Sequence, residues 1–314
     1  MKAAIVQGAG QAPVYGDFDE PVATAGEHRI AVTASAVSHL AKNRAAGTHY
    51  SSSGRFPFVV GIDGAGRLDD GRRVYFVMPR APYGSMAERT VASAQNCIAL
   101  PNALDDVTAA AIANPGMSSW VALVERARLK EGETVLVNGA TGTSGRLAVQ
   151  IARHLGAGKV IATGRRAEVL ETLGADATIQ LVEDPDALEQ RFRQQFAEGV
   201  DVVLDYLWGS SAACLLRAGA KAGAEAVPIR FVQIGALSGA EVALPAAVLR
   251  SSAIELMGSG IGSVAFERML KCIDDLLQAA VPAGFRVAAT PVPLTEFERG
   301  WASDDSTRRT VFTL

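Results

Sequence analysis

Cysteine is scarce in this chain of 314 residues. The three cysteines, Cys97, Cys214 and Cys272, are odd in number, far apart, and contain no Cys-x-x-Cys pair. This spacing excludes a disulfide framework and is typical of a reducing compartment such as the cytoplasm. We interpret the three residues as small buried apolar side chains.

An excess of positive charge is also absent. Lysine and arginine number 30 against 33 acidic residues, and no basic run exceeds two residues. The balance predicts neither a nucleic-acid partner nor binding to an anionic membrane. The apolar start, Met1–Val6, is too short for an export signal, and Asn114-Pro115-Gly116 interrupts the longest uncharged run, Val107–Val124. We therefore expect a cytoplasmic protein without a membrane span.

Histidine is rare as well. The four histidines, His28, His39, His49 and His154, have no spacing to a cysteine that would form a zinc site. We expect no metal.

What is present is enough apolar sequence for two domains, since 49% of the residues are hydrophobic. The first third contains β-like runs at Lys2–Val6, Arg29–Ala34 and Arg73–Val77. A helix over Asp106–Ile112 should stop at Asn114-Pro115-Gly116, and a second helix should cover Ser118–Arg128.

Strands and helices then alternate as far as residue 262, which indicates an α/β fold with a doubly wound parallel sheet. Val264–Ala280 is predicted as an amphipathic helix, and the β-like tail Arg286–Leu314 should rejoin the first lobe. The predicted domains are 1–115 with 263–314, and 116–262. The predicted strands are Thr134–Asn138, Lys159–Thr163, Ala177–Leu181, Val200–Tyr206, Arg230–Gly235 and Ile254–Gly258.

A glycine-rich segment follows the first of these strands. Its sequence is Ala140-Thr141-Gly142-Thr143-Ser144-Gly145, and helical spacing begins at Arg146. Between a strand and a helix, such glycines let a pyrophosphate approach the backbone at Gly142 and let the helix pack on its strand at Gly145. Ala140 replaces the first glycine of the usual motif, and Gly139 stands just before it. The alternative is a simple turn.

Two arginines follow the second strand. Arg165 stands 165 − 145 = 20 positions after Gly145, where NAD-binding proteins carry an acid. Guanidinium groups pair with phosphate, so Arg165 and Arg166 favour NADPH, through its ribose phosphate, over NADH. The alternative is a solvated pair at the start of a helix.

Further motifs resemble one known family. Over nearly its whole length the chain is similar to the medium-chain dehydrogenase/reductase superfamily, in its zinc-independent, quinone-oxidoreductase-like branch. The resemblance implies a GroES-like β-rich catalytic domain, a Rossmann domain, a substrate site in the cleft and a homodimer with contacts near Glu241–Gly258. It rests on Val59–Gly66, Tyr83–Glu88, Pro115–Ser118, the glycine segment, Leu173–Asp176, Val200–Asp205, Val232–Gly235 and Pro293-Leu294.

The chain departs from the family in its first lobe. Zinc-bearing relatives have metal ligands at positions that correspond to Ser38 and Ile62, and isoleucine cannot bind zinc. Quinone reductases place polar residues around the nicotinamide where this chain has Ser38, Ala41, Asn43 and His49, with Tyr50 adjacent. The resemblance thus makes Tyr50, Asn43 and His49 the candidate catalytic residues, with Ser38 as a further candidate donor.

The resemblance also implies the contacts of NADPH. Asp205 is expected to be a structural acid, and Trp208 either a wall of the cofactor site or a packing residue. The expected cofactor-binding residues are Ala140, Thr141, Gly142, Thr143, Ser144 and Gly145, then Arg165 and Arg166, with Asn114, Ser118, Ile234, Gly235, Ala236 and Ser259.

The expected activity is NADPH-dependent hydride transfer to a quinone or an α,β-unsaturated carbonyl compound, a small-molecule substrate. Because the residues around Ala41 differ from the polar residues of quinone reductases, the alternative is a non-catalytic NADPH-binding protein that acts as a sensor or scaffold.

Overall fold

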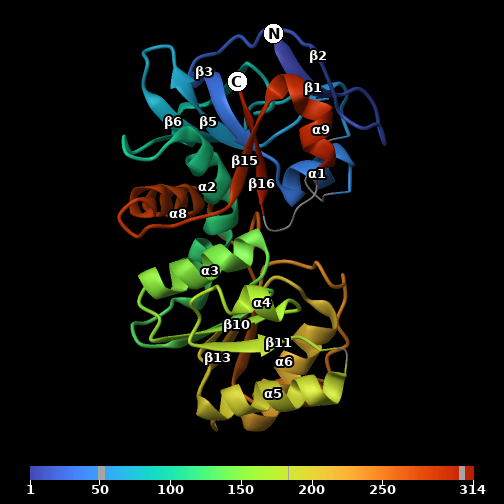
Figure 1. Ribbon diagram of the computed structural model, residues 1–314, viewed down its shortest axis with the longest axis vertical. Helices are drawn as coiled ribbons and strands as arrows, with labels where there is room; N and C mark the ends of the chain where they lie inside the picture. Colours follow the sequence, from blue (N-terminus) through green and yellow to red (C-terminus); the bar gives the residue numbers. More distant parts are fainter. Residues whose placement is uncertain (49–53, 183, 304–307) are drawn as a thin grey trace. The chain divides into compact units, whose positions relative to one another are not determined.

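The structure is a computed structural model that describes residues 1–48, 54–182, 184–303 and 308–314 (Figure 1). The chain forms two compact units: Met1–Asn114 with Ile273–Leu314 (unit 1), and Pro115–Cys272 (unit 2). The second boundary lies inside helix α8 (Phe266–Ala280), whereas the sequence places it before this helix. The first turns of α8 belong to unit 2, where Arg268 forms an ion pair of 2.7 Å with Glu125.

Unit 1 is built on two β-sheets that join the two ends of the chain. The last strand, β16 (Arg309–Thr313), pairs antiparallel with β3 (Glu27–Ala36), so the predicted return of the tail to the first lobe is confirmed. The larger sheet has the order β15-β16-β3-β5-β6-β8 with β7 also paired to β3, and the smaller has the order β2-β1-β4. The other strands are β1 (Lys2–Val6), β2 (Val14–Asp17), β4 (Phe58–Val59), β5 (Asp63–Leu68), β6 (Arg73–Val77), β7 (Arg89–Ser93), β8 (Cys97–Ala99) and β15 (Ala289–Pro293).

Two short helices pack on these strands. Helix α1 (His39–Ala45) and helix α9 (Phe297–Ala302) share a core with Met86 and Phe312, and the rings of Phe297 and Phe312 lie 5.0 Å apart. Short 3₁₀ turns cover Ala94–Asn96 and Leu294–Glu296.

Unit 2 is a six-stranded parallel sheet of the order β11-β10-β9-β12-β13-β14. The order reverses between β9 and β12, and in such sheets the carboxyl ends at the reversal form the ligand crevice. All six predicted strands are present, two with the predicted ends and four with an end that shifts by one or two residues, and the predicted fold class is confirmed. The strands are β9 (Thr134–Asn138), β10 (Lys159–Gly164), β11 (Ala177–Gln180), β12 (Val202–Asp205), β13 (Ile229–Gln233) and β14 (Ile254–Gly258); the helices are α3 (Thr143–His154), α4 (Ala167–Leu170), α5 (Pro185–Glu198), α6 (Gly209–Ala222) and α7 (Ala246–Arg250).

The predicted helix break at Asn114-Pro115-Gly116 is wrong. Helix α2 runs unbroken from Asp106 to Val121 with Pro115 inside, and a π-helical turn continues it over Ala122–Ala127. Proline forfeits one backbone hydrogen bond, but apolar packing on both sides of it outweighs that local cost. The residues that supply this packing are buried: Ala109–Ala113 and Trp120–Leu123.

The merged helix is also long and apolar enough to cross a membrane. Its segment Asp106–Ala127 reaches a mean hydropathy of 1.3, but 67% of that window is buried inside the protein. Such burial is typical of a core helix.

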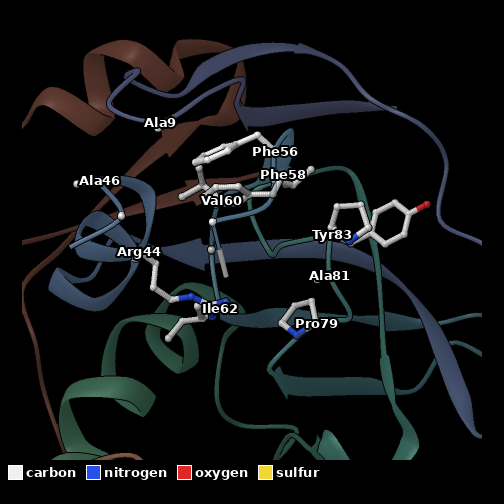
Figure 2. Close-up of a pocket in the computed structure, with 16 residues that line it drawn as sticks. Ala9, Arg44, Ala46, Phe56, Phe58, Val60, Ile62, Pro79, Ala81 and Tyr83 are labelled. Carbon is white, nitrogen blue, oxygen red and sulfur yellow. The ribbon is translucent and has the colours of Figure 1, made fainter. Parts of the chain in front are cut away.

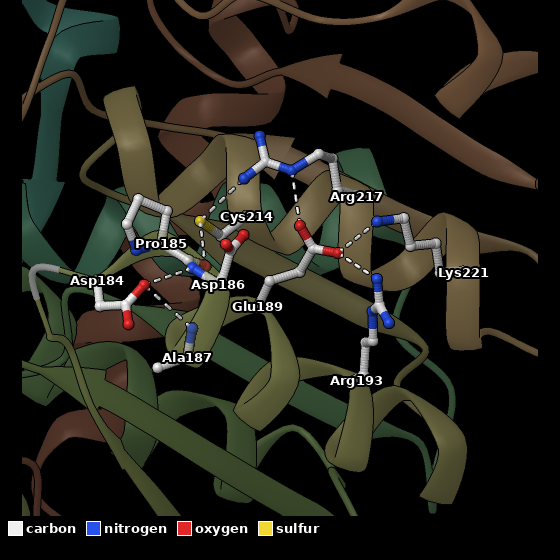
Figure 3. A network of polar contacts seen from close by, with 9 residues as sticks. All are labelled: Asp184, Pro185, Asp186, Ala187, Glu189, Arg193, Cys214, Arg217 and Lys221. Atoms are coloured by element: carbon white, nitrogen blue, oxygen red, sulfur yellow. Dashed lines mark hydrogen bonds and ion pairs between the residues drawn. The ribbon is translucent and has the colours of Figure 1, made fainter.

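One buried carboxylate ties α5 to α6 (Figure 3). Glu189 accepts hydrogen bonds from Arg217 at 2.7 Å, Lys221 at 2.8 Å and Arg193 at 2.6 Å. Burial opposes the charge of Glu189, but these three cations lower its pKa to about 2.

The Arg217 guanidinium also donates to the buried Cys214 thiol at 3.3 Å. Cys272 is likewise buried, whereas Cys97 is only partly buried, contrary to the prediction.

We expect Glu189→Gln to lower the free energy of unfolding by about 2–3 kcal/mol at neutral pH, because it leaves three cations without their anion. The pKa of Glu189 is below its ordinary value of 4.5 in the fold, so its contribution is complete above about pH 5 and disappears as the pH falls toward 2. Urea unfolding of both proteins at several pH values measures this.

The control is Glu198→Gln, which removes an exposed ion pair with Lys159. It should change the unfolding free energy by less than about 1 kcal/mol. Equal losses for the two variants would contradict the role of Glu189.

Candidate functional site

The glycine segment links β9 to α3 as a tight loop. Gly139 has a φ of +92°, and the amide of the buried Ala140 donates to the Thr163 carbonyl at 2.7 Å. Gly142 is the N-cap residue just before α3 and has an extended conformation, and no side chain caps the helix there. The first turn of α3 therefore has amide groups that no capping side chain covers, and these favour an anion.

The two glycines of the loop have different steric roles. A Cβ at Gly145 would lie 2.3 Å from the Gly139 carbonyl oxygen and 2.6 Å from the Cα of Ala140, so only glycine allows α3 to approach β9. A Cβ at Gly142 would meet nothing within 4 Å. Gly142 therefore faces open space, which leaves room for a ligand against the backbone.

The arginine pair lies beside this loop. Arg166 precedes α4, and its Nη2 donates to the Thr141 carbonyl at 3.4 Å. Arg165 is exposed, and its own carbonyl accepts a hydrogen bond from Gln180 at 3.1 Å. A Cβ at Gly164 would lie 2.3 Å from Thr141 Cγ2, so the end of β10 touches the loop. The Arg166 side chain thus lies next to the loop that leads into the uncapped start of α3, and Arg165 directly precedes it at the end of β10.

Beneath the loop is a buried polar network that the sequence analysis missed, apart from Asp205. Asn138 donates to Asp205 at 2.8 Å and to Ser211 at 3.0 Å, and Thr163 donates to Asn138 at 2.7 Å. Burial raises the pKa of Asp205, while the Asn138 bond and two backbone amides oppose that rise. The one available signal was the presence of polar residues at the ends of apolar strands.

The amides behind Asp205 come from the turn into α6. Leu207 and Trp208 donate to its carboxylate at 3.1 Å and 3.2 Å. Asp205 therefore has the structural role that the sequence predicts. Trp208 is partly buried, packs against the apolar core of unit 2 and has a φ of +57°.

Other expected cofactor residues follow the neighbouring parallel strands. The amides of Ile234 and Gly235 donate to the Asp205 carbonyl at 2.8 Å and 3.1 Å, and the Ser259 amide donates to Gln233 at 2.8 Å. Ala236 is exposed. Because the strands are parallel, these segments leave the same edge of the sheet as the glycine loop.

The two residues expected from the Asn114–Ser118 turn have separate partners. Ser118 donates to the Pro115 carbonyl at 2.6 Å, and its hydroxyl lies 3.2 Å from that of Tyr206, whose pKa burial raises to about 12. Asn114 belongs to unit 1 and donates to Asp63 at 3.0 Å. Burial raises the pKa of Asp63, and the Asn114 bond opposes this. The Asn114 amide is therefore bonded to a buried acid of its own unit.

Unit 1 contains a cavity of about 420 Å³ (Figure 2). Most of the residues that line it have apolar or no side chains, and they include Ala41 and Ile62, which lie in the region where the family resemblance predicts the substrate. Arg44, from the same face of α1 as Ala41, also lines the cavity. The sequence analysis missed Arg44, although the three-residue spacing from Ala41 was a usable signal.

The predicted donors of unit 1 include two described residues, Asn43 and Ser38. Asn43 is exposed and does not line the cavity. Ser38 is buried, and its hydroxyl caps α1 by accepting the Ala41 amide at 3.0 Å. His49 and Tyr50 lie outside the described residues.

Metal ligands do not gather anywhere in residues 1–48, 54–182, 184–303 and 308–314. No group of three or more His, Cys, Asp or Glu residues there could hold an ion. The absence of metal stays a prediction, and it rests on Ile62 and Ser38.

Comparisons with known proteins agree with this architecture. Residues 145–278 match a family described as zinc-binding dehydrogenase. The chain is 30% identical to a probable NADPH-dependent quinone reductase of Emericella nidulans over 94% of both chains. It is also 30% identical to prostaglandin reductase-3 of Mus musculus, over 64% of this chain and 55% of that protein. Among solved structures, the quinone oxidoreductase of Thermus thermophilus, also determined with NADPH, has a TM-score of 0.81 and 26% identity over 100% of both chains.

We expect Gly145→Ala to lower the free energy of unfolding by about 2–3 kcal/mol, because its methyl group overlaps backbone that cannot move aside. The loss should occur although alanine is the better helix former by about 1 kcal/mol. Chemical unfolding measures it.

Gly142→Ala is the matched control, since the same methyl group enters open space. It should leave stability within about 0.5 kcal/mol of the unmodified chain. An unchanged stability of Gly145→Ala would show that α3 can shift away from β9.

Proposed function

Since the chain belongs to the medium-chain dehydrogenase/reductase superfamily, in its quinone-oxidoreductase-like branch, we propose that it reduces quinones or α,β-unsaturated carbonyl compounds with NADPH. The observation that carries the proposal is an uncapped helix start that follows β9, at the reversal point of the parallel sheet, with Arg166 hydrogen-bonded to the same loop from the end of the neighbouring strand β10. The amides and the open face of Gly142 suit a pyrophosphate, and the guanidinium groups suit a further phosphate.

The residues of unit 2 have distinct tasks in this proposal. The backbone from Gly142 to Gly145 holds the pyrophosphate, and Thr143 and Ser144, both partly exposed, add hydroxyl donors. Arg165 and Arg166 hold the ribose phosphate. Segments after β13 and β14, including Gly235 and Ser259, border the same edge. When bound, NADPH supplies a hydride.

We place the substrate in the cavity of unit 1. Its volume of about 420 Å³ is in the range of small-molecule sites. Ile62 presents an apolar side chain there, and the Ser38 hydroxyl is committed to capping α1, so we propose reduction without zinc. A carbonyl oxygen that gains negative charge then needs a positive group or a hydrogen-bond donor. Tyr50, His49 and Asn43 stay predictions for the proton donor.

A homodimer in the cytoplasm completes the proposal. Strand β14 is the last strand of its sheet, and Glu255, Leu256 and Gly258 on it are exposed. An open sheet edge offers unpaired backbone groups to a second copy. Light scattering of the purified chain tests the homodimer: one copy has a mass of 32.8 kDa, and a dimer should have twice that mass.

A panel of quinones and enones tests the activity directly. We expect the purified chain to oxidise NADPH in the presence of at least one panel member, with loss of absorbance as the readout. Tight NADPH binding without turnover across the panel would favour the alternative, a non-catalytic NADPH-binding sensor or scaffold. Two observations favour this alternative: Asn43 is exposed, and the Ser38 hydroxyl is already used to cap α1.

The double variant Arg165→Ala and Arg166→Ala tests the cofactor choice. Each charge-assisted hydrogen bond to phosphate contributes about 1.5–3 kcal/mol, so NADPH binding should weaken at least tenfold. NADH lacks this phosphate, and its binding should change little. Equilibrium titration with both dinucleotides measures the ratio, and equal weakening of the two would refute the phosphate role.

A further inference from the structure

Among the described residues that line the cavity of unit 1, Arg44 is the single charged one. The other lining residues are glycines, prolines, alanines and larger apolar residues, including Phe56 and Phe58, whose rings lie 5.7 Å apart. Tyr83 is the one other polar residue, but its hydroxyl donates to the Glu20 carbonyl at 3.4 Å and points away from the cavity in Figure 2. Arg44 is therefore the one charged side chain that the described lining residues offer to a ligand.

The Arg44 guanidinium has no protein partner in the part of the chain that the structure describes. Other arginines of similar burial are paired, such as Arg73 with Asp106 and Arg230 with Glu133 at 2.7 Å. Burial lowers the pKa of Arg44, and no acid opposes that change. Arginine nevertheless stays protonated in proteins. A partly buried cation without an anion is costly, and a bound anion would remove that cost.

Figure 2 shows the geometry of such a site. The Arg44 side chain runs from α1 toward Ile62, and Phe56 and Phe58 lie farther along the same cavity, beyond Val60. Aromatic and branched walls suit a flat apolar ring system, and the guanidinium can hold a carboxylate through two parallel hydrogen bonds.

We propose that Arg44 binds a carboxylate of the substrate, so that the cavity selects acidic quinones and enones over their neutral esters. This inference rests on the proposed function, because the cavity is assigned to the substrate there. Arg44 is a specificity residue in this scheme, and it takes no part in the hydride step.

The test uses one matched pair of ligands, a naphthoquinone with a propanoate side chain and its methyl ester. Calorimetric titration in the presence of NADP⁺ should show the acid binding about 10- to 100-fold more tightly than the ester, the range for hydrogen bonds to charged groups. Arg44→Gln should remove the preference and leave ester binding within about twofold. Arg44→Lys should keep part of it, because lysine retains the charge without the planar fork.

Arg67→Gln is the control, since Arg67 is an exposed residue of β5 outside the cavity and its loss changes the net charge equally. It should keep the full preference for the acid. Equal affinity of the unmodified chain for acid and ester, failure to bind either, or a preference that survives Arg44→Gln would overturn the proposal.

Turnover of the same two compounds with NADPH separates this inference from the proposed function. Equal turnover of the acid and the ester would support the proposed reductase activity and contradict the proposed role of Arg44. Binding of the acid through Arg44 without any oxidation of NADPH would support the anion site and count against the reductase.

Discussion

The close approach of helix α3 to strand β9 is the contact on which the cofactor end of unit 2 depends. It exists because Gly145 has no side chain where the Gly139 carbonyl would stand 2.3 Å from a Cβ. That contact fixes the start of α3 and turns its first amides outward past Gly142. It also brings the loop against the end of β10, so that Arg166 reaches the Thr141 carbonyl. The small size of Gly145 therefore allows the uncapped amides of α3, the open space at Gly142 and the Arg166 guanidinium to lie around one loop.

Polar pairing under the loop keeps that edge of the sheet in register. Asn138 joins β9 to β12 through Asp205, and Thr163 joins β10 to β9. Each of the three side chains is fully buried, so a missing partner would leave a desolvated polar group. The network thus explains polar residues at the ends of strands that are otherwise apolar, and it assigns Asp205 to the support of the site.

Unit 1 shows how one position can change its chemistry within a family. The resemblance aligns Ile62 with a metal ligand of zinc-bearing relatives, yet here it forms part of an apolar wall. Ser38, at the other such position, caps α1 through its hydroxyl. Arg44, six residues further along on the same helix, also lines this cavity, and no described residue neutralises its charge.

The sequence by itself determined the features that neighbours in the chain control. Apolar runs marked the six strands of unit 2, and the spacing of Gly142, Gly145 and Arg165 predicted the dinucleotide site before any contact was known. Only the tertiary structure decided that α2 continues through Pro115, because the burial of its own apolar residues on both sides of the proline outweighs a local break. It alone showed that Arg44 lines the cavity while Asn43, its neighbour, is exposed. Which way a side chain faces, and whether a charge finds a partner, depend on residues far away in the chain, and no local pattern records them.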